Sequence, residues 1–145
     1  MSFDRIFFDL DGTLTDPKIG ITSAVMHALE HYGFPIPPRE ELLFFIGPPL
    51  DESFQKYCGF NREKAKEAVE VYREYYRPTG VFQNEVYEGI PEMLCSLKSA
   101  GKTLIMATSK PEYFANQIAE HYGFAKYFDL IVGSTMDGSI VKKED

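Results

Sequence analysis

Two aspartates stand two residues apart in the segment FFDLDGTLTD, residues 7–16, directly after a short apolar run. In an extended chain, residues two apart face the same side, so the carboxylates of Asp9 and Asp11 can reach one point. Gly12 permits a close approach of the backbone, and Thr13 adds a hydroxyl. Two clustered carboxylates favour a hard cation such as Mg²⁺, and this pair is therefore a candidate metal site.

The same pair offers a route to phosphate chemistry. A carboxylate held beside such an ion can attack phosphorus and form an aspartyl phosphate. A second carboxyl two residues further on can protonate the leaving oxygen and then activate water. The alternative is structural, because two aspartates in a turn can simply cap the segment that follows. The pair alone does not decide between these two interpretations.

Three short apolar runs predict the strands that position these side chains. They are RIFFDL at 5–10, TLIMATS at 103–109 and FDLIVGS at 128–134. The first suits a strand buried on both faces of a sheet. Between the second and third, apolar residues including Tyr113, Phe114 and Ile118 share one helical face, which predicts a strand–helix–strand crossover and a parallel sheet. Ligands bind at the carboxyl ends of such strands, where Asp9 and Asp11 are expected.

Residues 16–82 show helical signatures and no convincing strand. Asp16 followed by Pro17 predicts an N-cap and the first position of a helix that runs to Gly33. PREELLFFIG and LDESFQKYCG predict two shorter helices, and Asn61 opens a long amphipathic one. The predicted organisation is an α/β core of residues 1–15 and 83–145 with a helical insertion at 16–82.

The composition of the chain limits the classes of partner that it can bind. At 145 residues the chain has the size of about one domain, and its formal net charge of −7 disfavours nucleic acid and anionic membrane surfaces. No apolar run approaches the roughly 18 residues of a membrane span, and the N-terminus lacks the pattern of a signal peptide. We therefore expect a cytoplasmic protein with a small-molecule partner. Cys58 and Cys95 are expected to be reduced, half-buried thiols, and His31 and His121 to lie at helix ends.

The segment FFDLDGTLTD resembles the first motif of the haloacid dehalogenase superfamily, a hydrophobic run followed by DxDGT. LIMATSK at 104–110 resembles the second motif, and GSTMDGSIVKKED resembles the region that leads to the lysine of the third. The helical insertion resembles the small cap of that family, and ATSKPE is most similar to the phosphoglycolate-phosphatase-like branch. Dehalogenases lack the second aspartate that phosphatases and phosphomutases carry. The resemblance implies a Rossmann-like parallel sheet with an inserted helical cap.

Residue by residue, the resemblance implies Asp9 as nucleophile and Asp11 as general acid and base. Both would hold Mg²⁺, Asp11 through its backbone carbonyl. The hydroxyl of Thr108 would bind the phosphoryl oxygens, helped by backbone N–H groups near Gly12 and Ser109.

The lysines and the cap residues match the motifs of the family less closely than the aspartates do. Lys143 corresponds to the lysine of the third motif, with Lys142 one position away and a solvated lysine pair as the structural alternative. Lys110 would assist phosphate binding, or else be an exposed lysine that opens a helix. Lys18 and the loop IGPPL, which contains Gly47 and Pro48, would face the substrate, although Gly and Pro also serve as punctuation between helices.

One expected motif is missing. Members of the family carry a fourth motif with further Mg²⁺ carboxylates, and neither Asp129 nor Asp137 replaces it. The sheet is therefore expected to be incomplete at its C-terminus, with residues 5–10 as an exposed edge. The chain would then either associate with a copy or partner through this edge, or be marginally stable and bind Mg²⁺ weakly.

The expected activity is the Mg²⁺-dependent hydrolysis of a small phosphorylated metabolite through an aspartyl phosphate. This chain would be inactive if the missing carboxylates are essential. The alternatives are a non-catalytic protein of the same fold with weak phosphate binding, and a phosphomutase.

Overall fold

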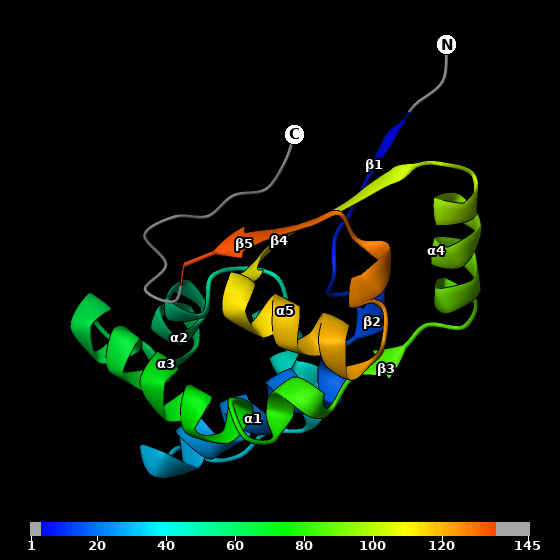
Figure 1. The fold of residues 1–145 in the computed structure, drawn as a ribbon. Helices are drawn as coiled ribbons and strands as arrows, with labels where there is room; N and C mark the ends of the chain where they lie inside the picture. The colour runs from blue at the N-terminus through cyan, green and yellow to red at the C-terminus, as the bar shows by residue number, and fades with distance from the viewer. Residues whose placement is uncertain (1–3, 136–145) are drawn as a thin grey trace. The chain divides into compact units, whose positions relative to one another are not determined.

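The computed structural model describes residues 4–135, which form two compact units. One is built from the chain up to Asp16 and from Glu85 onward, and the other is Pro17–Asn84 (Figure 1). No helix within residues 4–135 combines the length and the apolar character that crossing a membrane requires.

A parallel sheet organises the first unit. Its strands are β1 (Arg5–Phe8), β4 (Thr103–Pro111) and β5 (Leu130–Ser134), in the order β1-β4-β5. Helix α4 (Ile90–Ser99) precedes β4, and α5 (Glu112–His121) connects β4 to β5 (Figure 1). The three apolar runs are confirmed as strands of one α/β sheet, as is the crossover helix. Tyr113, expected on the buried face of α5, is instead 54% exposed.

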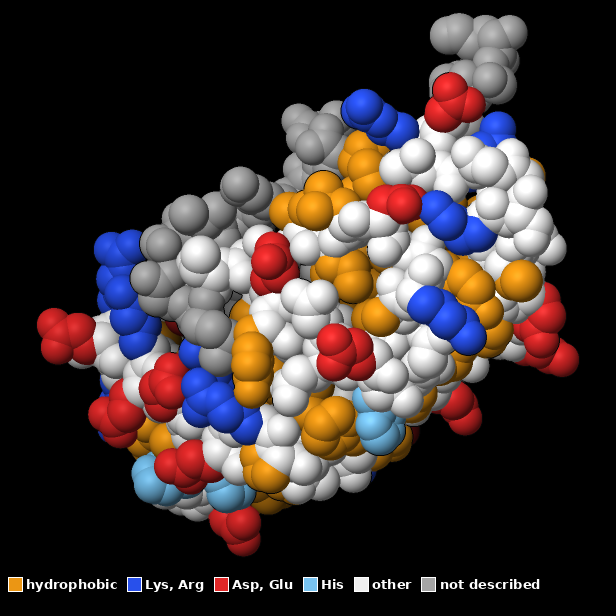
Figure 2. Space-filling model, in the orientation of Figure 1, with side chains coloured by type: hydrophobic (Ala, Val, Ile, Leu, Met, Phe, Trp, Pro, Cys, Tyr) orange, Lys and Arg blue, Asp and Glu red, His pale blue; other side chains and the backbone are white. Residues whose placement is uncertain are grey.

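The prediction that β1 is buried on both faces is wrong. Phe7 is 45% exposed, and it is in register with Ile105 and, through it, with Leu130, which is 53% exposed. Cross-strand partners share one face, whereas Leu104 and Met106 on the other face are fully buried. Among residues 4–135, β1 pairs with β4 alone, so it lies at the sheet edge. Figure 2 shows hydrophobic side chains open to solvent between charged ones on one face of the molecule.

The first unit also contains a two-stranded antiparallel ribbon, at the point where the chain leaves for the helical unit and returns from it. It consists of β2 (Thr15–Asp16) and β3 (Glu85–Val86), and it pairs Asp16 with Glu85. The prediction that Asp16 caps the first helix is therefore wrong, because the ribbon holds Asp16 in a strand. Pro17 occupies the N-cap position without a side-chain cap hydrogen bond.

The second unit is helical. Asn61 caps its longest helix as predicted, since its side chain accepts from Lys64 N at 2.8 Å. The segment PREELLFFIG, predicted as a short helix, forms a 3₁₀ helix. Two backbones touch where Gly20 N donates to Gln83 O, and a Cβ added at Gly20 would lie 2.1 Å from Gly80 O. The elements are α1 (Lys18–His31), η1 (Arg39–Phe45), α2 (Leu50–Cys58), α3 (Arg62–Tyr76) and η2 (Gly80–Phe82).

The segment EHYGF occurs at 30–34 and at 120–124, and it ends a helix in both places. Gly33 and Gly123 have φ of 77° and 82°, the left-handed conformation expected after a helix. His31 and His121 lie in the last turns of α1 and α5. Both cysteines are free thiols, as expected, but Cys95 is exposed rather than half-buried.

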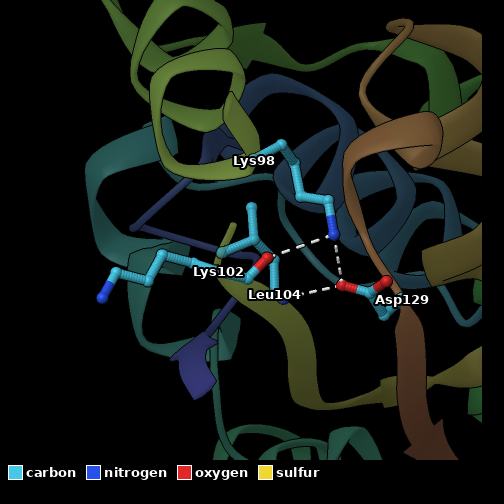
Figure 3. A network of polar contacts seen from close by, with 4 residues as sticks. All are labelled: Lys98, Lys102, Leu104 and Asp129. Atoms are coloured by element: carbon cyan, nitrogen blue, oxygen red, sulfur yellow. Dashed lines mark hydrogen bonds and ion pairs between the residues drawn. The ribbon is translucent and has the colours of Figure 1, made fainter. Parts of the chain in front are cut away.

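A polar network joins α4, β4 and the start of β5 (Figure 3). Lys98 Nζ lies 2.7 Å from Asp129 Oδ2 and donates to Lys102 O at 3.1 Å. Asp129 Oδ2 also accepts from Leu104 N at 2.9 Å. The Lys98 hydrogen bond, followed by that from Leu104, lowers the pKa of Asp129 below its usual 3.8.

This shift predicts how the network responds to acid. A carboxyl whose folded-state pKa is depressed stabilises the fold above its unfolded pKa of 3.8, and this contribution is lost as the pH falls through the folded-state pKa. We expect Asp129→Asn to lower the thermal midpoint at neutral pH, by little because the pair is partly exposed. The difference from wild type should shrink below about pH 4. Lys98→Met should behave alike, and a difference independent of pH would contradict the assignment.

Candidate active site

A tight turn at the carboxyl end of β1 holds the two aspartates. The carbonyl of Leu10 accepts from the backbone N–H groups of three following residues, Thr13, Leu14 and Thr15, at 2.9–3.2 Å. Gly12, with φ of 84°, allows the reversal and donates to Thr15 O at 2.8 Å. Because Leu10 is fully buried, Asp9 and Asp11 flank an anchored residue and are held in place by the backbone.

The end of β4 brings the second set of polar groups. Thr108 is 2% exposed, and its Oγ1 accepts from Lys110 N at 3.1 Å. A hydroxyl that accepts in this way keeps its hydrogen to donate elsewhere. The pairing of β4 with β5 shifts register between Ala107 and Pro111, which places these residues in an irregular stretch.

The two strand ends meet through a side-chain pair. Lys110 Nζ lies 3.3 Å from Asp11 Oδ2, with side-chain exposures of 7% and 15%. The alternative that Lys110 is an exposed lysine at a helix start is therefore wrong. Its side chain turns toward the loop after β1 and is almost completely covered.

The remaining predicted residues fall in three places. Ser109 is half-buried in β4, and Gly12 is exposed in the turn. Lys18 begins α1, and Gly47 and Pro48 lie in the loop between η1 and α2, all within the unit Pro17–Asn84. The candidates outside the described residues are Lys142, Lys143 and Asp137. The structure thus brings together the turn after β1 and the end of β4.

The oxygen donors of the turn can be compared with what Mg²⁺ requires. Residues 4–135 contain no group of three or more His, Cys, Asp or Glu side chains suited to a metal ion. Mg²⁺, however, keeps several waters and is bound through one or two carboxylates together with substrate phosphate. The carboxylate of Asp9 and the backbone carbonyl of Asp11 fit an ion bound in that way.

Sequence reasoning missed two residues that shape the end of β4. A Cβ added at Gly133 would lie 2.5 Å from Lys110 O and 2.8 Å from the backbone of Glu112. Gly133 N donates to Glu112 Oε1 at 3.1 Å. The available signal was the glycine in the predicted strand FDLIVGS, because a glycine within a strand often marks a close backbone approach.

A parallel α/β sheet with two aspartates after its first strand, and a helical unit inserted after them in the sequence, defines a Rossmann-like protein with an inserted helical cap. The model of the haloacid dehalogenase-like hydrolase family matches residues 6–139, and the chain belongs to this family.

The chain is also similar to relatives of known name and to solved structures. The chain is 48% identical over 145 residues to a 5'-nucleotidase of Pseudomonas aeruginosa, covering all of this chain and 66% of the relative. It is 41% identical over 140 residues to the tyrosine-protein kinase PtkA of Mycobacterium tuberculosis, covering 97% and 47%. A crystal structure of a predicted phosphatase from Clostridium acetobutylicum superposes with a TM-score of 0.94 at 46% identity, covering 100% and 67%. The chain thus spans about two thirds of the 5'-nucleotidase and of the Clostridium protein, and about half of PtkA.

Proposed function

We propose that the chain is a Mg²⁺-dependent phosphomonoester hydrolase that works through an aspartyl phosphate. The observation that carries this proposal is the meeting of two strand ends, which sets Asp11 3.3 Å from Lys110 with Asp9 two residues away. Thr108, almost fully buried, supplies a hydroxyl from the same end of β4. Carboxylate nucleophile, second carboxyl and phosphate-binding hydroxyl are the groups that such a reaction needs.

The proposed reaction has two steps. A carboxylate oxygen of Asp9 attacks phosphorus and forms an O–P bond while the ester P–O bond breaks, and the leaving oxygen takes its proton from the Asp11 carboxyl. Asp11, now a carboxylate, removes a proton from water. The water oxygen attacks phosphorus, the bond to Asp9 breaks, and inorganic phosphate leaves with the Asp9 carboxylate restored.

Other residues bind and orient the phosphoryl group. The hydroxyl of Thr108 donates to a phosphoryl oxygen, and the backbone N–H groups near Gly12 and Ser109 donate to others. When bound, Mg²⁺ would neutralise phosphate charge beside Asp9 and the carbonyl of Asp11. Lys143 is proposed as a further positive charge at the nucleophile.

The relatives guide the choice of substrate. We propose a small monophosphate, with a nucleoside 5′-monophosphate tested first because one relative is named a 5'-nucleotidase. Phosphoglycolate and a sugar phosphate follow. Lys18, Gly47 and Pro48 of the helical unit are proposed to contact the part of the substrate beyond the phosphate.

The test is phosphate release from these substrates and from an aryl phosphate, each with Mg²⁺ and with EDTA. We expect turnover that EDTA abolishes. Binding of inorganic phosphate without turnover of any ester would instead support a non-catalytic protein, and transfer of label to a second hydroxyl of the substrate would support a phosphomutase.

We also propose that this 145-residue chain associates with a second copy through β1. The edge position of β1 and the exposure of Phe7 support it, because an apolar edge strand is a template for pairing. Sedimentation velocity should show a dimer that dissociates on dilution, and Phe7→Lys should give monomer by placing a charge on the edge. Tyr113→Lys, which removes a somewhat more exposed aromatic ring from α5, should leave the dimer intact. A wild-type monomer at all concentrations would refute this pairing.

A further inference from the structure

We infer that Lys110 is a positioning residue for Asp11, holding its carboxyl where it delivers a proton to the leaving oxygen, rather than a ligand of the phosphate. This inference rests on the proposed function. It starts from the 3.3 Å separation of Lys110 Nζ and Asp11 Oδ2.

Burial strengthens the interaction between Lys110 and Asp11. The Lys110 side chain is 7% exposed and that of Asp11 15%, so water competes with their contact far less than with that of a surface pair. When the proton of the Asp11 carboxyl is on Oδ1, Oδ2 can still accept a hydrogen bond from the Lys110 ammonium, so the contact can orient the acid form as well as the carboxylate. A buried lysine side chain has already lost most of its conformational freedom when the protein folds. Little further freedom is therefore lost when Lys110 Nζ contacts Asp11. Oδ2 of Asp11 is thereby directed toward β4.

The backbone of Lys110 is fixed as well. Its N–H donates to Thr108 Oγ1 at 3.1 Å, and its carbonyl lies so close to β5 that a Cβ at Gly133 would be 2.5 Å away. Glu112 Oε1 accepts from Gly133 N at 3.1 Å and ties β5 to the start of α5. The hydrogen bond to Thr108 and the close approach of Gly133 therefore fix the backbone of Lys110, and the ion pair with Asp11 directs its buried side chain toward the turn after β1.

Positioning and phosphate binding have different kinetic consequences. A general acid contributes roughly 10²–10⁴-fold, and it matters most when the leaving oxygen is strongly basic. An alkoxide leaving group needs the proton of Asp11, whereas a nitrophenolate leaves readily without it. Loss of positioning should therefore affect alkyl esters selectively, but loss of a phosphate ligand should affect all esters alike.

The experiment compares wild type with Lys110→Met on a nucleoside 5′-monophosphate and on p-nitrophenyl phosphate. We expect kcat/KM to fall by about 10²-fold for the nucleotide and by less than about 10-fold for the aryl ester. Inhibition by inorganic phosphate should stay nearly unchanged. Lys110→Arg should restore part of the ratio between the two substrates, and Lys102→Met, the same change at the other end of β4, should leave both rates unaltered. Equal losses on both esters with weakened phosphate inhibition would overturn the inference.

A second measurement needs no turnover. The thermal midpoints of Lys110→Met, Asp11→Asn and the double variant form a cycle. A coupled pair predicts that the double variant melts close to the less stable single variant, whereas additive shifts would overturn the pairing. A wild type without activity on any ester would contradict the proposed function, and the cycle would still decide whether Lys110 holds Asp11.

Discussion

Asp9→Asn should lower the turnover of every phosphomonoester by on the order of 10³-fold or more, since removing a covalent nucleophile leaves only binding and charge stabilisation to catalysis. The amide oxygen of asparagine is a far weaker nucleophile and carries no charge for Mg²⁺. Asp9 Oδ1 accepts from Leu10 N at 2.8 Å, and the amide oxygen of asparagine can accept the same bond, so the turn should persist. Phosphate release under saturating substrate measures the loss.

Asp4→Asn is the matched control, because Asp4 precedes the same strand at its opposite, exposed end. It should retain wild-type turnover, and both variants should share the wild-type thermal midpoint within a few degrees. Retention of most Mg²⁺-dependent activity by Asp9→Asn would remove the nucleophile from the mechanism and with it the aspartyl phosphate.

Gly20→Ala should destabilise the unit Pro17–Asn84 by about 3 kcal/mol. Alanine normally favours a helix over glycine by about 1 kcal/mol, so a loss here would reveal a packing effect. The cause is the 2.1 Å approach of the added Cβ to Gly80 O, which α1 and η2 cannot accommodate without moving apart. That movement would also stretch the hydrogen bond from Gly20 N to Gln83 O, already 3.3 Å long.

Gly59→Ala provides the comparison within the same unit. Gly59 has φ of 72° and open space around its Cβ position, so alanine meets only the backbone cost of the left-handed region, roughly 1–2 kcal/mol. Urea unfolding of the two variants separates the effects. A Gly20→Ala protein as stable as wild type would show that the two backbones are not in contact.

Local sequence patterns predicted where strands and helices form better than they predicted which residues are buried or paired. Apolar runs located β1, β4 and β5, and Asn61 correctly marked the start of α3, because strand formation and capping depend on neighbouring residues. The burial of Phe7 was predicted wrongly, since exposure depends on what packs against the sheet. Asp16 was placed in a cap because its partner Glu85 is remote in sequence.

In the candidate site, too, local features were predicted and contacts between distant residues were not. The spacing of Asp9 and Asp11 and the resemblance to a family singled out the turn after β1, and the roles given to these residues remain predictions. The pair between Lys110 and Asp11 was not foreseen, because it joins residues at the ends of two strands that are far apart in the sequence. The residues around Lys110, TSKP, contain no local pattern that predicts a contact with the turn after the neighbouring strand β1.

The ribbon of β2 and β3 holds the two ends of the helical unit close together, so the unit could be replaced without changing the sheet. Since Asp16 faces Glu85 across an antiparallel pair, the chain departs from the sheet and returns to it roughly 5 Å apart. A hairpin turn of two residues could close that gap, and so could an unrelated domain of any length, because the cost of loop closure grows slowly. Recombination at these two positions could thus exchange the whole of Pro17–Asn84 and leave unchanged the turn that holds Asp9 and the strand that holds Thr108.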